Sequence, residues 1–246
     1  MHGDVTPSPE NITFALYTGG DPAIPLENFT TLKKIIERHG FRLKNISKLD
    51  TMEELEDVDV LILLTQKTIS DADIDILKNF TIFGGGSILF ILPPSIESGV
   101  EKLLNVYGFE ALGVATDNVS YYEKDTYVVV NGTWANTSIT NDLKALLVIN
   151  GTALNYTGDI KLLEELNLDK IMKLDENLQV PIVYVNKLIW GANTTSVEYK
   201  KGQKTYGENV TLCYVEEFWF GGRVVIILSL IHISEPTRPR LISYAV

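Results

Sequence analysis

Residues 58–92 read VDVLILLTQKTISDADIDILKNFTIFGGGSILFIL, and this stretch decides the predicted fold. Val58–Thr65 and Ser87–Leu92 are short and almost entirely apolar, which is typical of strands that are buried on both faces of a parallel sheet. Between them, Ser70 is a favourable helix N-cap residue, and apolar side chains recur at helical spacing until Gly84. The stretch therefore predicts a strand, a helix and a second, parallel strand.

The same alternation extends over the rest of the first half of the chain. Ile12–Tyr17 and Phe41–Ile46 predict two further strands, and the helical pattern between them ends at Gly40. A capping box begins a short helix at Thr51, and Ile96–Tyr107 predicts another helix. These alternations predict an α/β fold, namely a doubly wound, mostly parallel sheet with helices on both faces.

The second half of the chain alternates less regularly and predicts a β-rich extension. Strands are expected at Tyr127–Val130, Ala145–Ile149, Val180–Leu188, Val197–Lys200 and Thr211–Val215. One helix is expected near Ile160–Leu166, and Arg223–Ile227 predicts a strand that returns to the first sheet. The strands either extend the first sheet or form a lobe on it. We expect one domain over residues 11–227, with its β-rich part at about 114–220.

The two ends of the chain are expected to lie outside this domain. Residues 1–10 resemble a linker that follows a removed or unsequenced export segment. Residues 228–246, which begin LSLIHISEPTR, resemble the in-frame translation of a sequencing adapter, and the alternative is a natural basic tail. We expect this tail to be loosely packed and to lengthen the last strand by a residue or two at most. The natural protein is then expected to continue beyond residue 227 into a membrane anchor.

The charge and the rare residue types exclude several classes of function. The chain has 21 Lys and Arg against 32 Asp and Glu, which gives a net charge of −11. Because it has no basic patch with interleaved aromatic residues, we expect no binding to nucleic acid. Cys213 is the only cysteine, so neither an intrachain disulfide nor a thiolate metal site can form. Histidines are few, and we expect no metal and no cofactor.

Asn-x-Ser/Thr sequons are the strongest compositional signal. They include eleven of the 16 asparagines, whereas chance would give about two such acceptor sites. The acceptors are Asn11, Asn28, Asn45, Asn79, Asn118, Asn131, Asn136, Asn150, Asn155, Asn193 and Asn209. The excess predicts N-glycosylation and an extracytoplasmic location, and the alternative is a general bias toward Asn and Thr. A secreted protein without cysteine pairs indicates an archaeal cell surface.

Four segments together carry a resemblance to a known family. They are DVDVLILLTQ (57–66), ISDADIDILKNFTIFGGGSILFIL (69–92), LLNVYGFEA (103–111) and FGGRVVIILS (220–229). In these segments and their order the chain resembles the class I glutamine amidotransferase-like superfamily in its non-catalytic branches. Those branches include uncharacterised archaeal and bacterial surface proteins, extracytoplasmic subunits of gliding-type ABC transporters, and the lumenal non-catalytic subunit of oligosaccharyltransferase.

The resemblance also implies that a catalytic centre is missing. Catalytic members of the superfamily carry a Gly-x-Cys-x-Gly nucleophile elbow where the chain here reads Leu92-Pro93-Pro94-Ser95. Two prolines fix two φ angles and remove two N–H groups, so this turn cannot form the elbow. Ser95 is the alternative nucleophile, but no histidine lies near it in the pattern. Cys213 lies within a predicted strand and is expected to be an inert, buried thiol.

Two regions are candidates for binding. Ligands of open α/β sheets bind beyond the carboxyl ends of the strands, and the residues expected there are Gly19, Gly20, Asp21, Pro94 and Ser95. The alternative for the TGGDP sequence is a simple flexible turn. The stretch Glu216–Phe220 joins two acids to three aromatic residues and is either a loop that covers the sheet edge or a contact with a partner.

The expected function is a non-enzymatic, extracytoplasmic binding or scaffold module of a membrane-associated assembly, for example a transporter accessory subunit. Its partner is expected to be a membrane-associated protein, and no membrane span is expected within residues 1–227. One alternative is a subunit similar to an accessory subunit of oligosaccharyltransferase. The other is an amidotransferase or hydrolase whose site is not recognisable in the sequence.

Overall fold

The computed structural model describes residues 12–23, 25–64, 66–82, 84–93, 95–137, 140, 143, 145–158, 183–199, 202–218 and 221–228. The predicted linker at 1–10, the predicted helix near 160–166 and the tail beyond residue 228 lie outside these ranges.

The first half of the chain forms the elements that its apolar pattern predicts. In chain order these are β1 (Thr13–Tyr17), η2 (Leu26–Phe29), α1 (Thr30–Arg38), β2 (Arg42–Ile46), η3 (Met52–Leu55), β3 (Val60–Leu64), α2 (Asp71–Ile82), β4 (Ser87–Leu92) and α3 (Ser98–Val106). The capping box predicted at Thr51 is present at the start of η3. Each predicted strand and helix of this half is therefore confirmed to within a few residues.

The second half of the described chain forms strands and one short 3-10 helix. They are β5 (Phe109–Asp117), β6 (Tyr121–Tyr122), β7 (Lys124–Val130), β8 (Leu146–Ile149), β9 (Thr152–Tyr156), β10 (Val183–Trp190), β11 (Thr195–Tyr199), β12 (Gln203–Tyr206), η4 (Gly207–Asn209), β13 (Thr211–Phe218) and β14 (Arg223–Leu228). The sequence did not predict β5, β6, β9 or β12.

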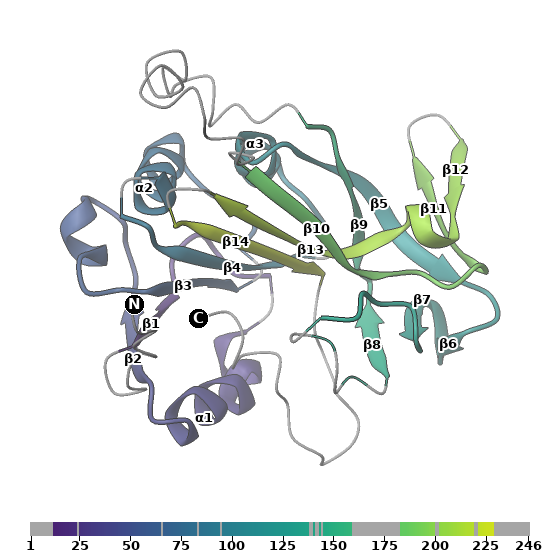
Figure 1. Ribbon diagram of the computed structural model, residues 1–246, viewed down its shortest axis with the longest axis horizontal. Coiled ribbons are helices and arrows are strands. Elements are labelled where there is room, and N and C mark those ends of the chain that lie inside the picture. Colours follow the sequence, from purple (N-terminus) through teal and green to yellow (C-terminus); the bar gives the residue numbers. More distant parts are fainter. Residues whose placement is uncertain are drawn as a thin grey trace, which may run out of the picture.

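The described strands form one large mixed sheet and one small sheet. The large sheet has eleven strands in the order β12-β11-β5-β9-β13-β14-β4-β3-β1-β2, with β10 also paired to β13. In Figure 1 this sheet crosses the molecule from β2 to β12. The small sheet has the order β6-β7-β8. Strands from both halves of the sequence thus lie in the same large sheet.

The predicted fold class, a doubly wound and mostly parallel sheet with helices on both faces, is wrong. Among the described pairings of the large sheet, four are parallel, and they join β2, β1, β3, β4 and β14. The other six are antiparallel. After α3, the last α-helix of the described chain, no described α-helix is available to form the crossover that a parallel connection uses. Short connections make β11 and β12, and β13 and β14, antiparallel, and the other four antiparallel pairs join strands that are farther apart in the sequence.

The parallel strands form the centre of the hydrophobic core. Every residue of β1 and β3 is buried, and the two strands pair in register from Phe14↔Val60 to Tyr17↔Leu63. β14 then pairs with β4 from Arg223↔Ser87 to Leu228↔Leu92. The predicted parallel arrangement of these four segments is therefore present within the mixed sheet.

A tight turn links the two kinds of pairing. β13 and β14 are joined by a turn in which Gly222 accepts a hydrogen bond from the amide of Phe218, at 2.9 Å between N and O. A side chain at Gly222 would collide with the carbonyl oxygen of Thr81 at the end of α2. The turn needs a glycine there because the helix packs directly against its backbone.

Among the helices of the described residues, none has the length and apolar character that a membrane span requires.

Candidate functional site

The loop after β1 is packed against the loop after β3, at the carboxyl ends of the parallel strands. The amides of Lys67 and Thr68 donate to the carbonyl oxygens of Asp21 and Gly20, at 3.2 and 3.0 Å. The Lys67 ammonium also pairs with the Asp21 carboxylate at 3.2 Å. These amides, carbonyl oxygens and charged groups are therefore already paired with one another, which leaves fewer polar atoms of the loop free to bind a ligand.

The two glycines of this loop are explained by close packing. A Cβ at Gly19 would lie 2.6 Å from the carbonyl oxygen of Ser47 and 2.7 Å from the hydroxyl of Tyr17. Gly20 has a φ of +71°, and a Cβ there would collide with the carbonyl oxygen of Thr68. The Gly-Gly pair thus lets the chain approach two neighbouring loops.

A buried glutamine lies at the same edge. Gln66 is 0% exposed, and its Nε2 donates to the carbonyl oxygen of Tyr17 at 3.0 Å. Its Oε1 accepts no hydrogen bond from any residue that the structure describes. Burial and the nearby carboxylate of Asp73 raise the pKa of Tyr17 to about 12, so this phenol stays neutral at physiological pH.

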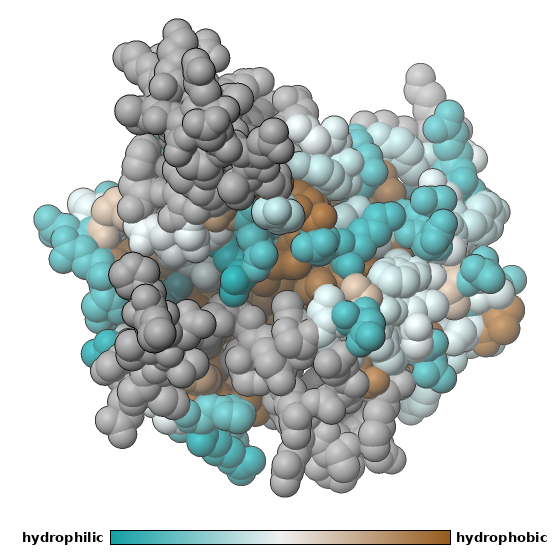
Figure 2. Space-filling model, in the orientation of Figure 1, coloured by the Kyte–Doolittle hydropathy of each residue, from teal (hydrophilic) through white to brown (hydrophobic). Residues whose placement is uncertain are grey.

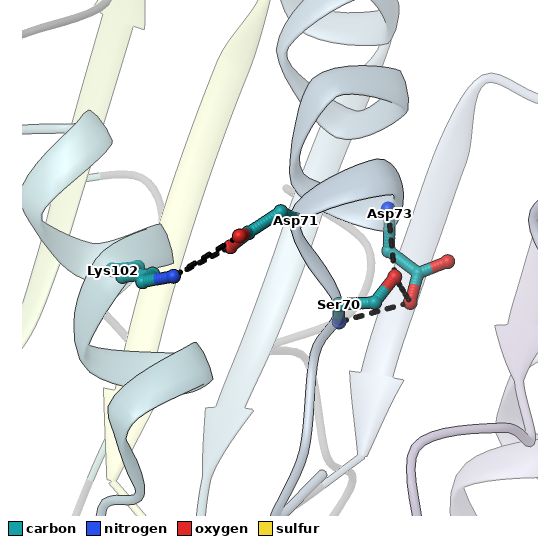
Figure 3. A network of polar contacts seen from close by, with 4 residues as sticks. All are labelled: Ser70, Asp71, Asp73 and Lys102. Atoms are coloured by element: carbon teal, nitrogen blue, oxygen red, sulfur yellow. Dashed lines mark hydrogen bonds and ion pairs between the residues drawn. The ribbon is translucent and has the colours of Figure 1, made fainter.

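The N-terminus of α2 also lies at the carboxyl ends of the parallel strands, but side chains of the protein cap it, so it is not free to bind an anion. Asp73 accepts hydrogen bonds from the amide and the hydroxyl of Ser70, at 3.1 and 2.8 Å, and the Ser70 hydroxyl accepts from the Asp73 amide. Figure 3 shows Asp71 on the other side, pointing to Lys102 of α3, and their ion pair spans 2.8 Å. Helix N-termini attract anions, but two aspartates in the first turn repel a phosphate here.

The turn after β4 lacks the features of a nucleophile elbow. Pro93 is buried and Ser95 is exposed, while Pro94 lies outside the described residues. The described non-glycine residues with positive φ are Asp21, Glu123 and Asn150, so Ser95 does not have the strained backbone of an elbow nucleophile. No described hydrogen bond or ion pair joins Ser95 to the loop at Gly19–Asp21.

The one histidine of the described residues lies too far from Ser95 to activate it. His39, the one histidine within the described ranges, precedes β2, whereas Ser95 follows β4. Because β2 and β4 run in the same direction, His39 lies at the amino ends of the parallel strands and Ser95 at their carboxyl ends. The length of the strands separates the two residues by roughly 17 Å. Direct proton transfer between them is excluded.

Cys213 is the third residue of β13 and lies opposite Ile227 of β14. It is 2% exposed, and burial raises the pKa of its thiol to about 12. The expectation of a buried cysteine within a strand is therefore confirmed. No group of three His, Cys, Asp or Glu side chains within the described ranges could hold a metal ion.

A second, buried site was missed at the sequence level. Glu216 lies within β13, is 0% exposed, and has no hydrogen-bond partner for either carboxylate oxygen among the described residues. Tyr214 and Phe218 share its face of the strand. That face packs on aromatic residues that follow α3, since the Tyr107 and Phe218 rings lie 6.2 Å apart and the Phe109 and Tyr214 rings 5.1 Å apart.

Burial raises the pKa of Glu216 to about 9. The side chain is therefore protonated at neutral pH, because ionisation without a partner in an apolar environment is more costly than binding a proton. The stretch Glu216–Phe220 was expected to be either a loop that covers the sheet edge or a contact with a partner. The structure places Glu216 to Phe218 within β13, and Trp219 and Phe220 lie outside the described residues. The period-two sequence Leu212, Tyr214, Glu216, Phe218 was the available signal.

The sequon asparagines lie mostly at the surface. Of the nine whose side chains are described, Asn150 is half-buried and the other eight are exposed, namely Asn45, Asn79, Asn118, Asn131, Asn136, Asn155, Asn193 and Asn209. Asn11 and the side chain of Asn28 lie outside the description.

The small sheet carries an exposed apolar tip. Val119, in the turn before this sheet, is 70% exposed, and Tyr121 and Tyr122 of β6 are 48% and 56% exposed. Figure 2 shows an apolar spot at this end of the molecule, over β6 and β7, and another area of apolar surface near β10. Tyr184 of β10 is also largely exposed.

No family model and no curated protein matches the sequence. Solved structures do match: the N-terminal domain of mmIFT52 is 16% identical, with 88% of this chain and 84% of that chain covered and a TM-score of 0.61. A ThuA-like protein from Bacteroides uniformis is 12% identical over 92% and 84% of the two chains, with a TM-score of 0.47. A β-galactosidase from Rahnella is 11% identical over 88% of this chain and 28% of that chain, also at 0.47. The likeness to the mmIFT52 domain shows a shared fold.

Proposed function

We propose that this protein is a non-enzymatic binding or scaffold module on the extracytoplasmic side of a membrane-associated assembly. The observation that carries the proposal is the surface position of the sequons: eight of the nine described acceptor side chains are exposed. Each of these eight could carry a glycan that extends into solvent, so the number of sequons and their placement agree with a glycosylated surface.

The exposed tip of the small sheet is the surface best suited to a partner. Aromatic residues are enriched at protein interfaces because they present large, rigid contact areas. Tyr121 and Tyr122 present such an area beside Val119, next to the sequon at Asn118. A membrane-associated protein partner is the occupant that we propose.

A fractionation experiment tests the location. Antibodies against the protein should detect it in the membrane fraction of cells of its natural source, and its electrophoretic mobility should increase after chemical deglycosylation. Detection in the cytoplasmic fraction, with no change in mobility after deglycosylation, would contradict the proposal. A cytoplasmic protein of the same cells serves as the fractionation control.

The non-enzymatic part of the proposal predicts no turnover of glutamine or of simple amide and ester substrates at pH 7. With a thiol pKa of about 12, only about one Cys213 side chain in 100,000 is a thiolate at this pH. No described hydrogen bond joins Ser95 to a side chain that could act as its base. The purified protein is assayed beside its Cys213→Ala and Ser95→Ala variants, and turnover that either substitution abolishes would overturn this part.

A further inference from the structure

Transfer of an oligosaccharide to asparagine uses two side chains of the sequon together. The carboxamide nitrogen attacks the anomeric carbon of an oligosaccharide that is linked to a lipid diphosphate. A C–N bond forms, the C–O bond to the diphosphate breaks, the lipid diphosphate leaves with the electron pair, and an amide proton passes to a base. The Ser or Thr hydroxyl two residues later defines the acceptor, so the transferase must reach both side chains.

Secondary structure decides whether these two side chains are accessible together. Along a strand, residues i and i+2 lie on the same face, so an exposed asparagine is accompanied by an exposed hydroxyl. Along an α-helix, two residues correspond to a rotation of about 200°, so the asparagine and the hydroxyl point in opposite directions. A sequon on an amphipathic helix is therefore divided between the surface and the core.

Asn79 of α2 belongs to such a divided sequon. Its side chain is exposed, whereas Thr81 is 0% exposed. The Thr81 hydroxyl lies 3.1 and 3.0 Å from the carbonyl oxygens of Leu77 and Lys78 and 3.2 Å from the hydroxyl of Tyr107. A transferase can reach this hydroxyl only after the end of α2 has opened.

The sequons at Asn193 and Asn209 are divided in a different way. Each asparagine is exposed and lies just before a strand, and the threonine is the first residue of that strand. Thr195 and Thr211 are both 0% exposed. The Thr195 hydroxyl donates to the carboxylate of Asp117 at 2.7 Å, so it is held inside the fold.

Two other sequons keep both side chains at the surface. Asn45 is near the end of β2, and Asn155 is near the end of β9, and both are exposed. Ser47 and Thr157, two residues later, are exposed as well. The Thr157 hydroxyl does donate to the carbonyl oxygen of Gly108 at 2.9 Å, but from a surface position.

We propose that these sequons fall into two classes by the time of modification. Asn79, Asn193 and Asn209 accept an oligosaccharide only before the domain folds, whereas Asn45 and Asn155 remain acceptors in the folded domain. This inference rests on the glycosylated surface of the proposed function. It adds that the glycans of the first class must be attached during or directly after export, while the chain is still unfolded.

The test uses the full chain, produced without glycans and folded. A purified single-subunit oligosaccharyltransferase and a lipid-linked oligosaccharide are added, and the occupancy of each site is followed by mass spectrometry. Five synthetic peptides, each with one of the five sequons, serve as unfolded references. In the folded chain, Asn79, Asn193 and Asn209 should react about 100-fold more slowly than their peptides, because the hydroxyl is reached only through local opening. Asn45 and Asn155 should react at rates close to those of their peptides.

The substitution Asp117→Ala provides a matched variant. It removes the acceptor of the Thr195 hydroxyl, so the rate of modification should rise more at Asn193 than at Asn79. Modification of Asn79 in the folded chain at the peptide rate would overturn the inference, as would peptides that are not accepted at all. Because the assay uses isolated protein, its outcome does not depend on cellular location, and fractionation tests the proposed function separately.

Discussion

The free energy of unfolding should fall by about 1.4 kcal/mol per pH unit between about pH 5 and 9 because of Glu216 alone. In the unfolded chain this carboxyl ionises near its ordinary pKa of 4.5, whereas in the folded protein the pKa is about 9. Over this window the folded state therefore binds one proton more than the unfolded state. The stability that the buried, protonated Glu216 contributes is therefore fully present below pH 4.5, and it is lost as the pH rises toward 9.

The substitution Glu216→Gln should remove this dependence. Glutamine has nearly the shape of the protonated acid and does not ionise, so its burial carries no pH-dependent penalty. At pH 7 the variant should be more stable than the parent by about 3 kcal/mol, and the difference should vanish near pH 4. Urea unfolding at one-unit pH steps from 4 to 9 measures both curves, by the fluorescence of the three tryptophans.

Glu217→Gln provides the matched control. Glu217 is the next residue of β13, is partly exposed, and pairs with Arg223 at 2.7 Å. Ion pairs at such positions contribute about 1 kcal/mol or less, so this variant should retain the slope of the parent protein. If the Glu216→Gln curve instead runs parallel to that of the parent from pH 5 to 9, Glu216 is not the buried, protonated acid described here.

The sequence predicted the parallel part of the fold and missed much of the antiparallel part for a physical reason. β3 and β4 are buried on both faces, so their residues form continuous apolar runs. β5 is partly buried along most of its length, and Gly113 interrupts it with a φ of +152° and a register shift against β9. Neither a continuous run nor a clear alternation marks such a strand.

The direction of a strand depends on its connections, and composition alone does not show it. β13 is a largely buried strand in the middle of the sheet, yet a short turn at Gly221 and Gly222 makes it antiparallel to β14. The repeated alternation before residue 107 suggested a doubly wound fold, and the strands predicted in the second half were treated as a β-rich extension of it, so the antiparallel pairing of most of the large sheet was missed.

Candidate sites were predictable only where residue type alone carries the chemistry. The sequons can be recognised in the sequence as a motif. Which of them have a buried hydroxyl can be told only from the structure, which shows where Thr81, Thr195 and Thr211 lie. The loop at Gly19 and Gly20 was located correctly at a strand end, but its glycines serve packing. Glu216 was not recognised because a charged pair before aromatic residues is more typical of a surface loop.

Asp117 is expected to be the most important polar side chain for stability in the antiparallel half. It ends β5 and is 1% exposed. Its carboxylate accepts hydrogen bonds from the amides of Val119 and Ser120, at 2.9 and 2.8 Å, and from the hydroxyls of Thr194 and Thr195, at 2.9 and 2.7 Å. One side chain thus joins the turn after β5 to the turn before β11.

These hydrogen bonds also set the charge state of the residue. Burial by itself would raise the pKa of Asp117, but hydrogen bonds from Ser120, Thr195, Val119 and Thr194 stabilise the ionised form more strongly, and the pKa lies below its usual value. The contribution of Asp117 to stability is therefore present above the ordinary aspartate pKa of about 3.9, and it is lost as the pH falls through the lower folded pKa.

The substitution Asp117→Ala should lower the free energy of unfolding at pH 7 by about 4 kcal/mol, because it leaves four buried or partly buried donors without their acceptor. Asp117→Asn should lower it by only about 1–2 kcal/mol, since the amide oxygen still accepts from the two backbone N–H groups and the threonine hydroxyls can rotate. Asp125→Ala, at an exposed position of β7, should change it by about 0.5 kcal/mol or less. Urea unfolding at pH 7 and pH 3 measures all three. Similar losses for Asp117→Ala and Asp125→Ala at pH 7, or a loss for Asp117→Asn that is no smaller at pH 3 than at pH 7, would show that the ionised carboxylate does not hold the two turns together.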